Sequence, residues 1–237
     1  MIAIFKREIR AYFTSPLGYF FIAVFLILNG AIFAFCTLQQ GSDSNLARYF
    51  TAILFAFVVL IPLLTMRSFA EERKAKTEQL LLTAPVTLPG MVCGKFFASY
   101  AMFLMTLFVG LFDLYPLYKF SEDAPNTPRI IGYIIGIALV GAAFVAVGIF
   151  ISSLTENQLI ASLGTMAVLL LFLVTSFLNQ YIPFPWLRSV LSWVSIYSRY
   201  GNFTYGYFDF AAILYYASIC FVFLFLTVRV YEKRRWA

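Results

Sequence analysis

The sequence contains no histidine and few charged residues. Only 12% of its 237 residues are Asp, Glu, Lys or Arg, whereas 62% are hydrophobic and the mean hydropathy is +0.87. A typical soluble domain is about 25% charged. Without histidine, the chain lacks the commonest general base and metal ligand. The composition therefore indicates an integral membrane protein, with no soluble segment large enough for a nucleotide-binding fold.

The three cysteines, Cys36, Cys93 and Cys220, are isolated and show no metal or redox spacing, so we expect packing thiols. The net charge of +6 could suggest a nucleic-acid partner. However, the cations stand at the ends of apolar runs, which membrane topology explains without nucleic acid. The first apolar run is too long for a signal peptide and has no small-residue cleavage site, so we expect a retained membrane anchor.

Six apolar segments are long enough to cross a bilayer, which takes about 20 residues as a helix. Placing both termini in the cytoplasm puts twelve Lys and Arg residues inside and five outside, in agreement with the positive-inside rule. A short polar turn, residues 152–157, joins the fourth and fifth segments. We therefore predict one all-α transmembrane domain, residues 1–237, in the cell membrane. Its six spans are expected at about 17–38, 47–66, 96–117, 131–151, 158–179 and 209–229.

Two shorter segments have amphipathic patterns. Residues 2–13 place apolar side chains on one helical face and Lys6, Arg7 and Arg10 elsewhere, which predicts an interfacial helix that ends at Ser15-Pro16. Residues 186–200 predict an outer interfacial or re-entrant helix before the last span. Its polar and aromatic positions include Arg188, Ser192, Trp193 and Arg199.

Residues 67–95 form a charged island between the second and third spans. Eight of its residues are ionisable, and the assumed orientation places it in the cytoplasm. We expect a helix from Ser68 to Thr83 that continues the second span, then a break at Ala84-Pro85. Glu72 and Lys76 have the spacing of a helical ion pair. Lys95 stands where the third span enters the bilayer, a position suited to snorkelling.

The island can be interpreted as a solvated loop or as a docking surface. Residues 80–82 are leucines in an otherwise polar segment, and an apolar patch rimmed by charge favours docking of a partner protein. The residues assigned to this interface are Arg67, Glu71, Glu72, Arg73, Thr77, Glu78, Leu80, Leu81, Pro85 and Lys95, together with Lys6, Arg7 and Arg10.

Several motifs of the chain are those of a known family. They are Arg67, residues 70–73 (AEER), 77–81 (TEQLL), 84–86 (APV) and 94–95 (GK), the N-terminal 6–10 (KREIR) with Ser15-Pro16 and Tyr19, and 191–206 with Tyr215-Tyr216 and 234–236 (RRW). On these residues the whole chain resembles the permease of ABC-2-type transporters, most closely the gliding-motility-associated and copper-processing branch. A histidine–phenylalanine pair would stand before the last span, whereas this chain has residues 197–200 (YSRY), so that histidine's role does not carry over.

The resemblance implies that the island is a coupling helix seated in a separate ATPase. Two ATPase copies would bind ATP and Mg²⁺ and drive two permeases, identical or paralogous. Export is the expected direction of transport, and an accessory membrane or extracytoplasmic protein is a further expected partner. The chain itself has no GxxxxGK[ST] phosphate loop, so we expect neither a bound cofactor nor catalysis in it. A mechanotransmitting subunit that moves a partner without export stays open.

Polar residues in the spans could line a substrate path. The candidates are Asn29, Thr37, Thr165, Thr175 and Ser176, although Ser and Thr also bond to their own helix carbonyls. Two other classes are less well supported. An intramembrane enzyme usually needs histidine near its glutamates, and a secondary transporter would show inverted repeats and charges at mid-membrane.

Overall fold

The computed structural model of the chain describes residues 1–38, 46–79, 86–120, 126–178, 184, 186, 195–204 and 209–236. The regular structure in these ranges is helical. The elements are α1 (Ile2–Thr14), α2 (Pro16–Phe33), the π-helix η1 (Ala34–Leu38), α3 (Leu46–Thr65), α4 (Arg67–Lys74), α6 (Leu88–Gly110), the 3-10 helix η3 (Leu111–Leu114), α7 (Tyr115–Phe120), α8 (Thr127–Leu154), α9 (Gln158–Leu178), α11 (Ile196–Thr204) and α12 (Phe210–Trp236).

Six of the described helical segments are long and apolar enough to cross a membrane, which confirms the predicted number of spans. Each overlaps one predicted segment. They cover Pro16–Thr37, Leu46–Lys74, Leu88–Leu114, Thr127–Leu154, Gln158–Thr175 and Phe210–Arg235.

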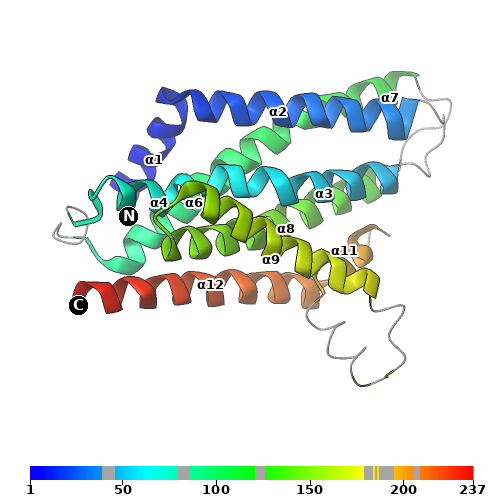
Figure 1. Ribbon diagram of the computed structural model, residues 1–237. Coiled ribbons are helices and arrows are strands. Elements are labelled where there is room, and N and C mark those ends of the chain that lie inside the picture. Colours follow the sequence, from blue (N-terminus) through cyan, green and yellow to red (C-terminus); the bar gives the residue numbers. More distant parts are fainter. Residues whose placement is uncertain are drawn as a thin grey trace.

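The long helices form an elongated bundle around α8 (Figure 1). Helix α8 contacts α3, α6, α9, α11 and α12, and it is more buried than α2, α9 or α12. Small residues allow this close packing. A Cβ atom at Gly148 would lie 2.2 Å from Oγ1 of Thr65 in α3, and one at Gly141 would lie 2.2 Å from the ring of Phe103 in α6. Backbones approach closely where glycine faces a neighbouring helix.

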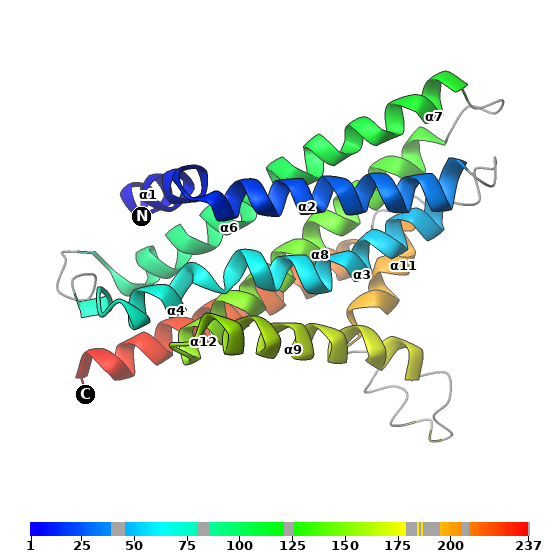
Figure 2. The same ribbon diagram turned by 45° about the horizontal axis from the view of Figure 1, so that its top comes forward.

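Both chain termini lie at the same end of the bundle, together with α1 and α4 (Figures 1 and 2). Helices α7 and α11 lie at the opposite end. We call the end that holds both termini, α1 and α4 the termini end. An even number of crossings necessarily returns the chain to the side where it started.

The helix predicted for residues 68–83 differs in the structure. The second span is interrupted at Met66, where α3 ends and α4 begins, and α4 itself ends at Lys74. Lys76 has a φ of 55°, a left-handed conformation that is uncommon outside glycine and that stops the helix. The predicted helical ion pair between Glu72 and Lys76 is therefore wrong. Glu72 pairs with Arg7 and Lys95 instead. Residues 80–85, with the predicted break, lie outside the described residues.

Two further boundaries were predicted incorrectly. Ser152 and Ser153 belong to α8 and are buried, so the turn to α9 is confined to residues 155–157. The third span begins at Leu88, with Pro89 in its first turn. Proline is tolerated there because the first helical N–H groups have no intrahelical acceptor.

Candidate functional site

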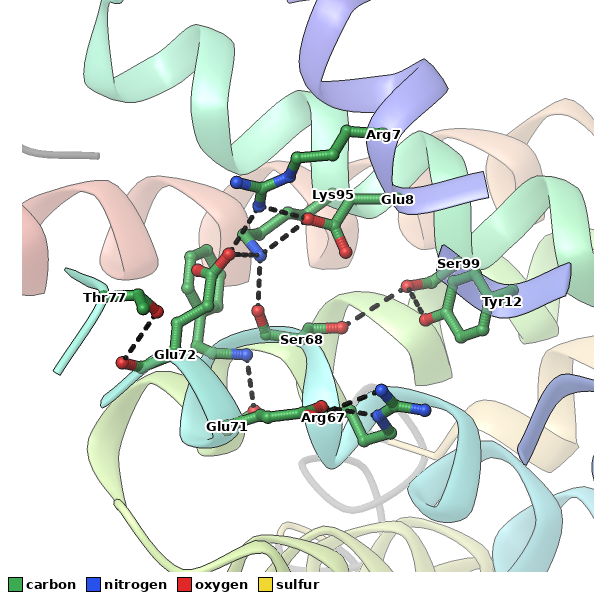
Figure 3. A network of polar contacts seen from close by, with 12 residues as sticks. Arg7, Glu8, Tyr12, Arg67, Ser68, Glu71, Glu72, Thr77, Lys95 and Ser99 are labelled. Atoms are coloured by element: carbon green, nitrogen blue, oxygen red, sulfur yellow. Dashed lines mark hydrogen bonds and ion pairs between the residues drawn. The ribbon is translucent and has the colours of Figure 1, made fainter. Parts of the chain in front are cut away.

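Four charged side chains from α1, α4 and α6 meet at the termini end: Arg7, Glu8, Glu72 and Lys95 (Figure 3). We call them the α1–α4–α6 charge cluster. Nζ of Lys95 lies 3.1 Å from Oε1 of Glu8 and 2.9 Å from Oε1 of Glu72. Arg7 donates hydrogen bonds to the same two carboxylates. The cluster thus joins segments that are far apart in sequence.

Lys95 does not snorkel toward water, so that prediction is wrong. Its side chain is 1% exposed, and Nζ also donates to the backbone carbonyl of Ser68 at 2.6 Å. The ammonium lies 4.9 Å from the centroid of the Phe69 ring. Removing an ion from water costs several kcal/mol, and in proteins only close counter-charges and hydrogen bonds offset that cost. The position of Lys95 therefore depends on its partners in α1 and α4.

The electrostatics of the cluster keep Glu8 ionised. Burial alone would raise the pKa of Glu8, but the charges and hydrogen bonds of Lys95 and Arg7 outweigh burial and lower the pKa below its ordinary value. At neutral pH Glu8 is therefore a carboxylate that can pair with both cations.

Tyr12 and Arg67 extend these contacts to the α3–α4 junction and the α1–α2 junction. The Tyr12 hydroxyl donates to the carbonyl of Leu64 at 3.1 Å and lies 3.0 Å from Oγ of Ser99 (Figure 3). Arg67 binds the Glu71 carboxylate through two nitrogens and donates to Oγ of Ser15 at 2.8 Å. Polar bonds thus connect α1 to α3, α4 and α6.

A cavity of about 330 Å³ opens beside the α1–α4–α6 charge cluster. Its walls come from α1, α4, α6 and the turn after α4, and include Arg7, Arg67, Glu72, Thr77 and Lys95. Apart from Thr77, whose hydroxyl donates to the Glu72 carbonyl, these residues pair with other charges of the same wall. The arrangement suits a junction between helices better than a binding site for a charged small molecule.

A second group of charges lies on the other side of α4. It consists of Arg73, Glu78, Glu156 and Arg234, which we call the α4–α8–α12 charge cluster. Arg73 donates to Glu156 at 2.7 Å and to the Leu154 carbonyl at 3.1 Å. Glu78 accepts from Arg234 at 3.3 Å and lies 3.6 Å from Nε of Arg73. Because Arg234 also donates to the Ser153 carbonyl at 2.7 Å, α4 is tied to α8 and α12.

The structure brings together only part of the predicted interface. Arg7, Glu72, Lys95, Arg73 and Glu78 belong to the two clusters, whereas Lys6 and Arg10 of α1 are exposed. Leu80, Leu81 and Pro85 lie outside the described residues.

The predicted path residues are separated in the structure. Asn29 donates to the Gly110 carbonyl and to Asp113 at 2.7 Å, and accepts from the Tyr49 hydroxyl. Thr165 and Thr175 donate to carbonyls of their own helix. Thr37 is buried in η1, and the Ser176 side chain lies outside the described part of the chain.

Of the outer helix predicted for residues 186–200, the structure describes Trp186 and residues 195–200. Helix α11 contains Arg199, whose guanidinium lies 4.8 Å from the ring centroid of Tyr215 in α12. Arg188, Ser192 and Trp193 fall outside the described residues. In the ranges that the structure covers, no three His, Cys, Asp or Glu side chains gather where they could hold a metal ion.

A comparison with known families explains this architecture. Residues 8–230 match the model of a family described as ABC-2 family transporter protein. The chain belongs to this family. It is therefore a multi-pass membrane protein of the permease type in ATP-binding-cassette transporters, which generally work with an ATPase subunit and often as dimers. A search of the curated proteins finds no significant match to this ABC-2 permease.

Sequence reasoning did not assign Glu8, Ser152 or Glu156 to the candidate site. Glu8 is the only acidic residue of the N-terminal helix, where Lys6, Arg7 and Arg10 surround it in sequence. A single carboxylate among several cations is the signal in the sequence that could have indicated an ion pair between Glu8 and another helix of the chain.

Proposed function

We propose that this ABC-2 permease is driven at its termini end by a separate cytosolic ATPase. The main support for this proposal comes from residues 67–79, which we call the α4 arm. This arm takes part in both charge clusters. The α1–α4–α6 charge cluster connects the arm to α1 and α6, and the α4–α8–α12 charge cluster connects it to α8 and α12. A force applied to the arm is thereby distributed to four other helices.

The remaining parts of the proposal come from the family. Two ATPase copies bind ATP and Mg²⁺, and two permeases, identical or paralogous, enclose a path for export across the cytoplasmic membrane. The termini end faces the cytoplasm, α1 lies in the membrane interface, and residues 80–85 enter the ATPase. Asn29, Thr37, Thr165, Thr175 and Ser176 remain the proposed path residues. We keep the relationship to the gliding-motility-associated and copper-processing branch as part of this proposal.

Internal pairing of the charges supports an arm that moves as a rigid part. The carboxylates of Glu8, Glu71, Glu72 and Glu78 each contact a cation of this same chain. They are therefore occupied by partners within the chain, while the segment after Glu78 is left to contact the ATPase. Rigid-body motion of packed elements is a common way to open and close a cavity.

The proposal is tested by purifying the tagged permease with its ATPase and measuring ATP hydrolysis in lipid nanodiscs. We expect Leu81→Glu to abolish assembly, because it places a charge in the apolar segment that enters the ATPase. Glu78→Arg should lower hydrolysis by about tenfold or more, because it places a third cation between Arg73 and Arg234. A tenfold effect corresponds to about 1.4 kcal/mol.

The matched controls are Leu159→Glu and Glu232→Arg, which make the same chemical changes on the exposed start of α9 and near the end of α12. Both should keep assembly and hydrolysis at the level of the unmodified permease. If Leu81→Glu and Glu78→Arg also behave as the unmodified permease does, the α4 arm is not the coupling element.

A further inference from the structure

The second span is interrupted at Met66, although no glycine or proline stands there. In an uninterrupted helix the N–H of Phe69 would donate to the Thr65 carbonyl, and that of Ala70 to the Met66 carbonyl. Sharp bends in helices have identifiable causes, one of which is a side chain inserted into this hydrogen-bond pattern. The group that bonds to these backbone atoms at Met66 comes from another helix.

Ser152 of α8 supplies the inserted group. Its hydroxyl oxygen accepts hydrogen bonds from the N–H of Phe69 at 3.1 Å and the N–H of Ala70 at 3.2 Å. The same hydroxyl donates to the Met66 carbonyl at 3.1 Å. It therefore occupies the donor and the acceptor that a straight helix would join to each other. Ser152 is completely buried, so water does not substitute for it at this point.

The surrounding contacts hold the interruption from the other sides. Tyr12 of α1 donates to the Leu64 carbonyl, and Lys95 of α6 donates to the Ser68 carbonyl. One turn before Ser152, Gly148 lies directly against Thr65, so that α3 and α8 are pressed together on the membrane side of the bend. The α3 side of the junction is thus fixed by packing and by the hydrogen bond from Tyr12, whereas the α4 side is fixed by hydrogen bonds from Lys95 and with Ser152.

We propose that Ser152 is the positioning residue of a hinge at Met66, about which the α4 arm tilts relative to α3. Its hydroxyl keeps the helix open at this one place, because it satisfies the backbone groups that a bend exposes. A hydroxyl rotates about its C–O bond and accepts through two lone pairs, so it can follow a small change of angle and keep both N–H groups bonded. An unpaired buried N–H would cost about 1–3 kcal/mol. This inference rests on the proposed function, since it assigns the joint on which the driven arm turns.

The experiment measures the angle of the arm by distances between spin labels. The labels are placed at Lys74→Cys on α4 and Leu159→Cys on α9, both exposed, after replacement of Cys36, Cys93 and Cys220. In Ser152→Ala, α3 and α4 are expected to straighten. With about 12 Å of helix beyond Met66 and a bend of about 20°, the distance should shift by about 4 Å.

Two matched variants separate the hinge from general damage. Ser153→Ala removes the neighbouring buried hydroxyl, which donates only to the Phe150 carbonyl of its own helix, and should leave the distance unchanged. Ser152→Thr keeps a hydroxyl at the hinge and should restore the original distance. An unchanged distance in a well-folded Ser152→Ala protein, or a shift equal to that of Ser153→Ala, would overturn the hinge.

A second measurement uses the complex with the ATPase. On addition of ATP and Mg²⁺ the label distance should change in the unmodified permease and in Ser153→Ala, and the change should be lost in Ser152→Ala. If ATP changes the distance equally in all three, Ser152 is not the joint. Failure of the permease to bind any ATPase would contradict the proposed function, whereas the straightening measured in the permease alone would still stand.

Discussion

Lys95 occupies a place where a charge is tolerated only while its partners are present. Its ammonium contacts Glu8 and Glu72 and is almost fully buried. Removal of one member of such a buried group leaves the others uncompensated, and it typically destabilises a protein more than replacing the whole group by neutral residues does. Lys95 therefore allows a direct test of the α1–α4–α6 charge cluster.

We predict that Lys95→Met lowers stability by about 3 kcal/mol, because the two largely buried carboxylates of Glu8 and Glu72 then share Arg7 as their counter-charge. The triple variant Lys95→Met, Glu8→Gln, Glu72→Gln should recover most of that loss. Thermal unfolding of the purified permease, followed by loss of monodispersity, measures both. Lys74→Met removes an exposed lysine at the end of α4 and is the control, with little change expected. Equal behaviour of Lys95→Met and Lys74→Met would show that the cluster contributes nothing to stability.

The role of these residues could be predicted from sequence only in part. A lysine at the start of an apolar segment has the same sequence context whether it reaches water or a buried carboxylate. What decides between the two is Glu8, which lies 87 residues away and which the fold alone brings near Lys95. Likewise, nothing local separates Ser152, which holds another helix open, from Ser153, which bonds to its own helix.

At the scale of elements, the contact between α3 and α8 determines where the bundle can bend. Hydrophobic length alone predicted the six spans, because about 20 apolar residues have few alternatives to a membrane helix. The break at Met66 was not predictable in this way. Pro62 lies one turn earlier inside α3, and proline disturbs the bond to the residue four positions before it, here Val58, on the side away from Met66.

We predict that Gly148→Ala destabilises the permease by about 1–3 kcal/mol, the usual effect of overpacking a tight contact. The new Cβ would lie 2.2 Å from Oγ1 and 2.9 Å from Cβ of Thr65, so α3 and α8 must separate. Gly201→Ala in α11 is the control, because a Cβ there meets nothing within 4 Å. Midpoints of thermal unfolding should fall for Gly148→Ala only. A similar midpoint for both variants would mean that the contact between α3 and α8 adapts to the added methyl group without loss of stability.

For the whole molecule, the common position of the two termini leads to a prediction about sidedness. The excess of Lys and Arg at the termini end favours the cytoplasm for this end. On a cysteine-free background, a membrane-impermeant maleimide should label Lys119→Cys of α7 in intact cells. It should label Lys6→Cys and Arg235→Cys only after the cells are opened. The reverse pattern would place the ATPase interface at the other end.

Family and general architecture were accessible from the sequence because they depend on long hydrophobic runs and on motifs that span the chain. The family match confirms the permease class, while the assignment of residues 1–237 to one transmembrane domain stays a prediction. The arrangement of charges within the termini end depends on which helices become neighbours. That arrangement is a property of the packed bundle and has no counterpart in any single segment.

The sharing of one ammonium by two carboxylates also constrains how this protein can evolve. Reversing Lys95 alone would place three negative charges together, and reversing Glu8 or Glu72 alone would add a cation beside Lys95 and Arg7. No single exchange restores the balance of charge, so we expect intermediates between the charged and neutral forms of the cluster to be less stable than either end state. Related permeases should therefore carry the complete set or none of it, with positions 8, 72 and 95 changing together in their ancestry.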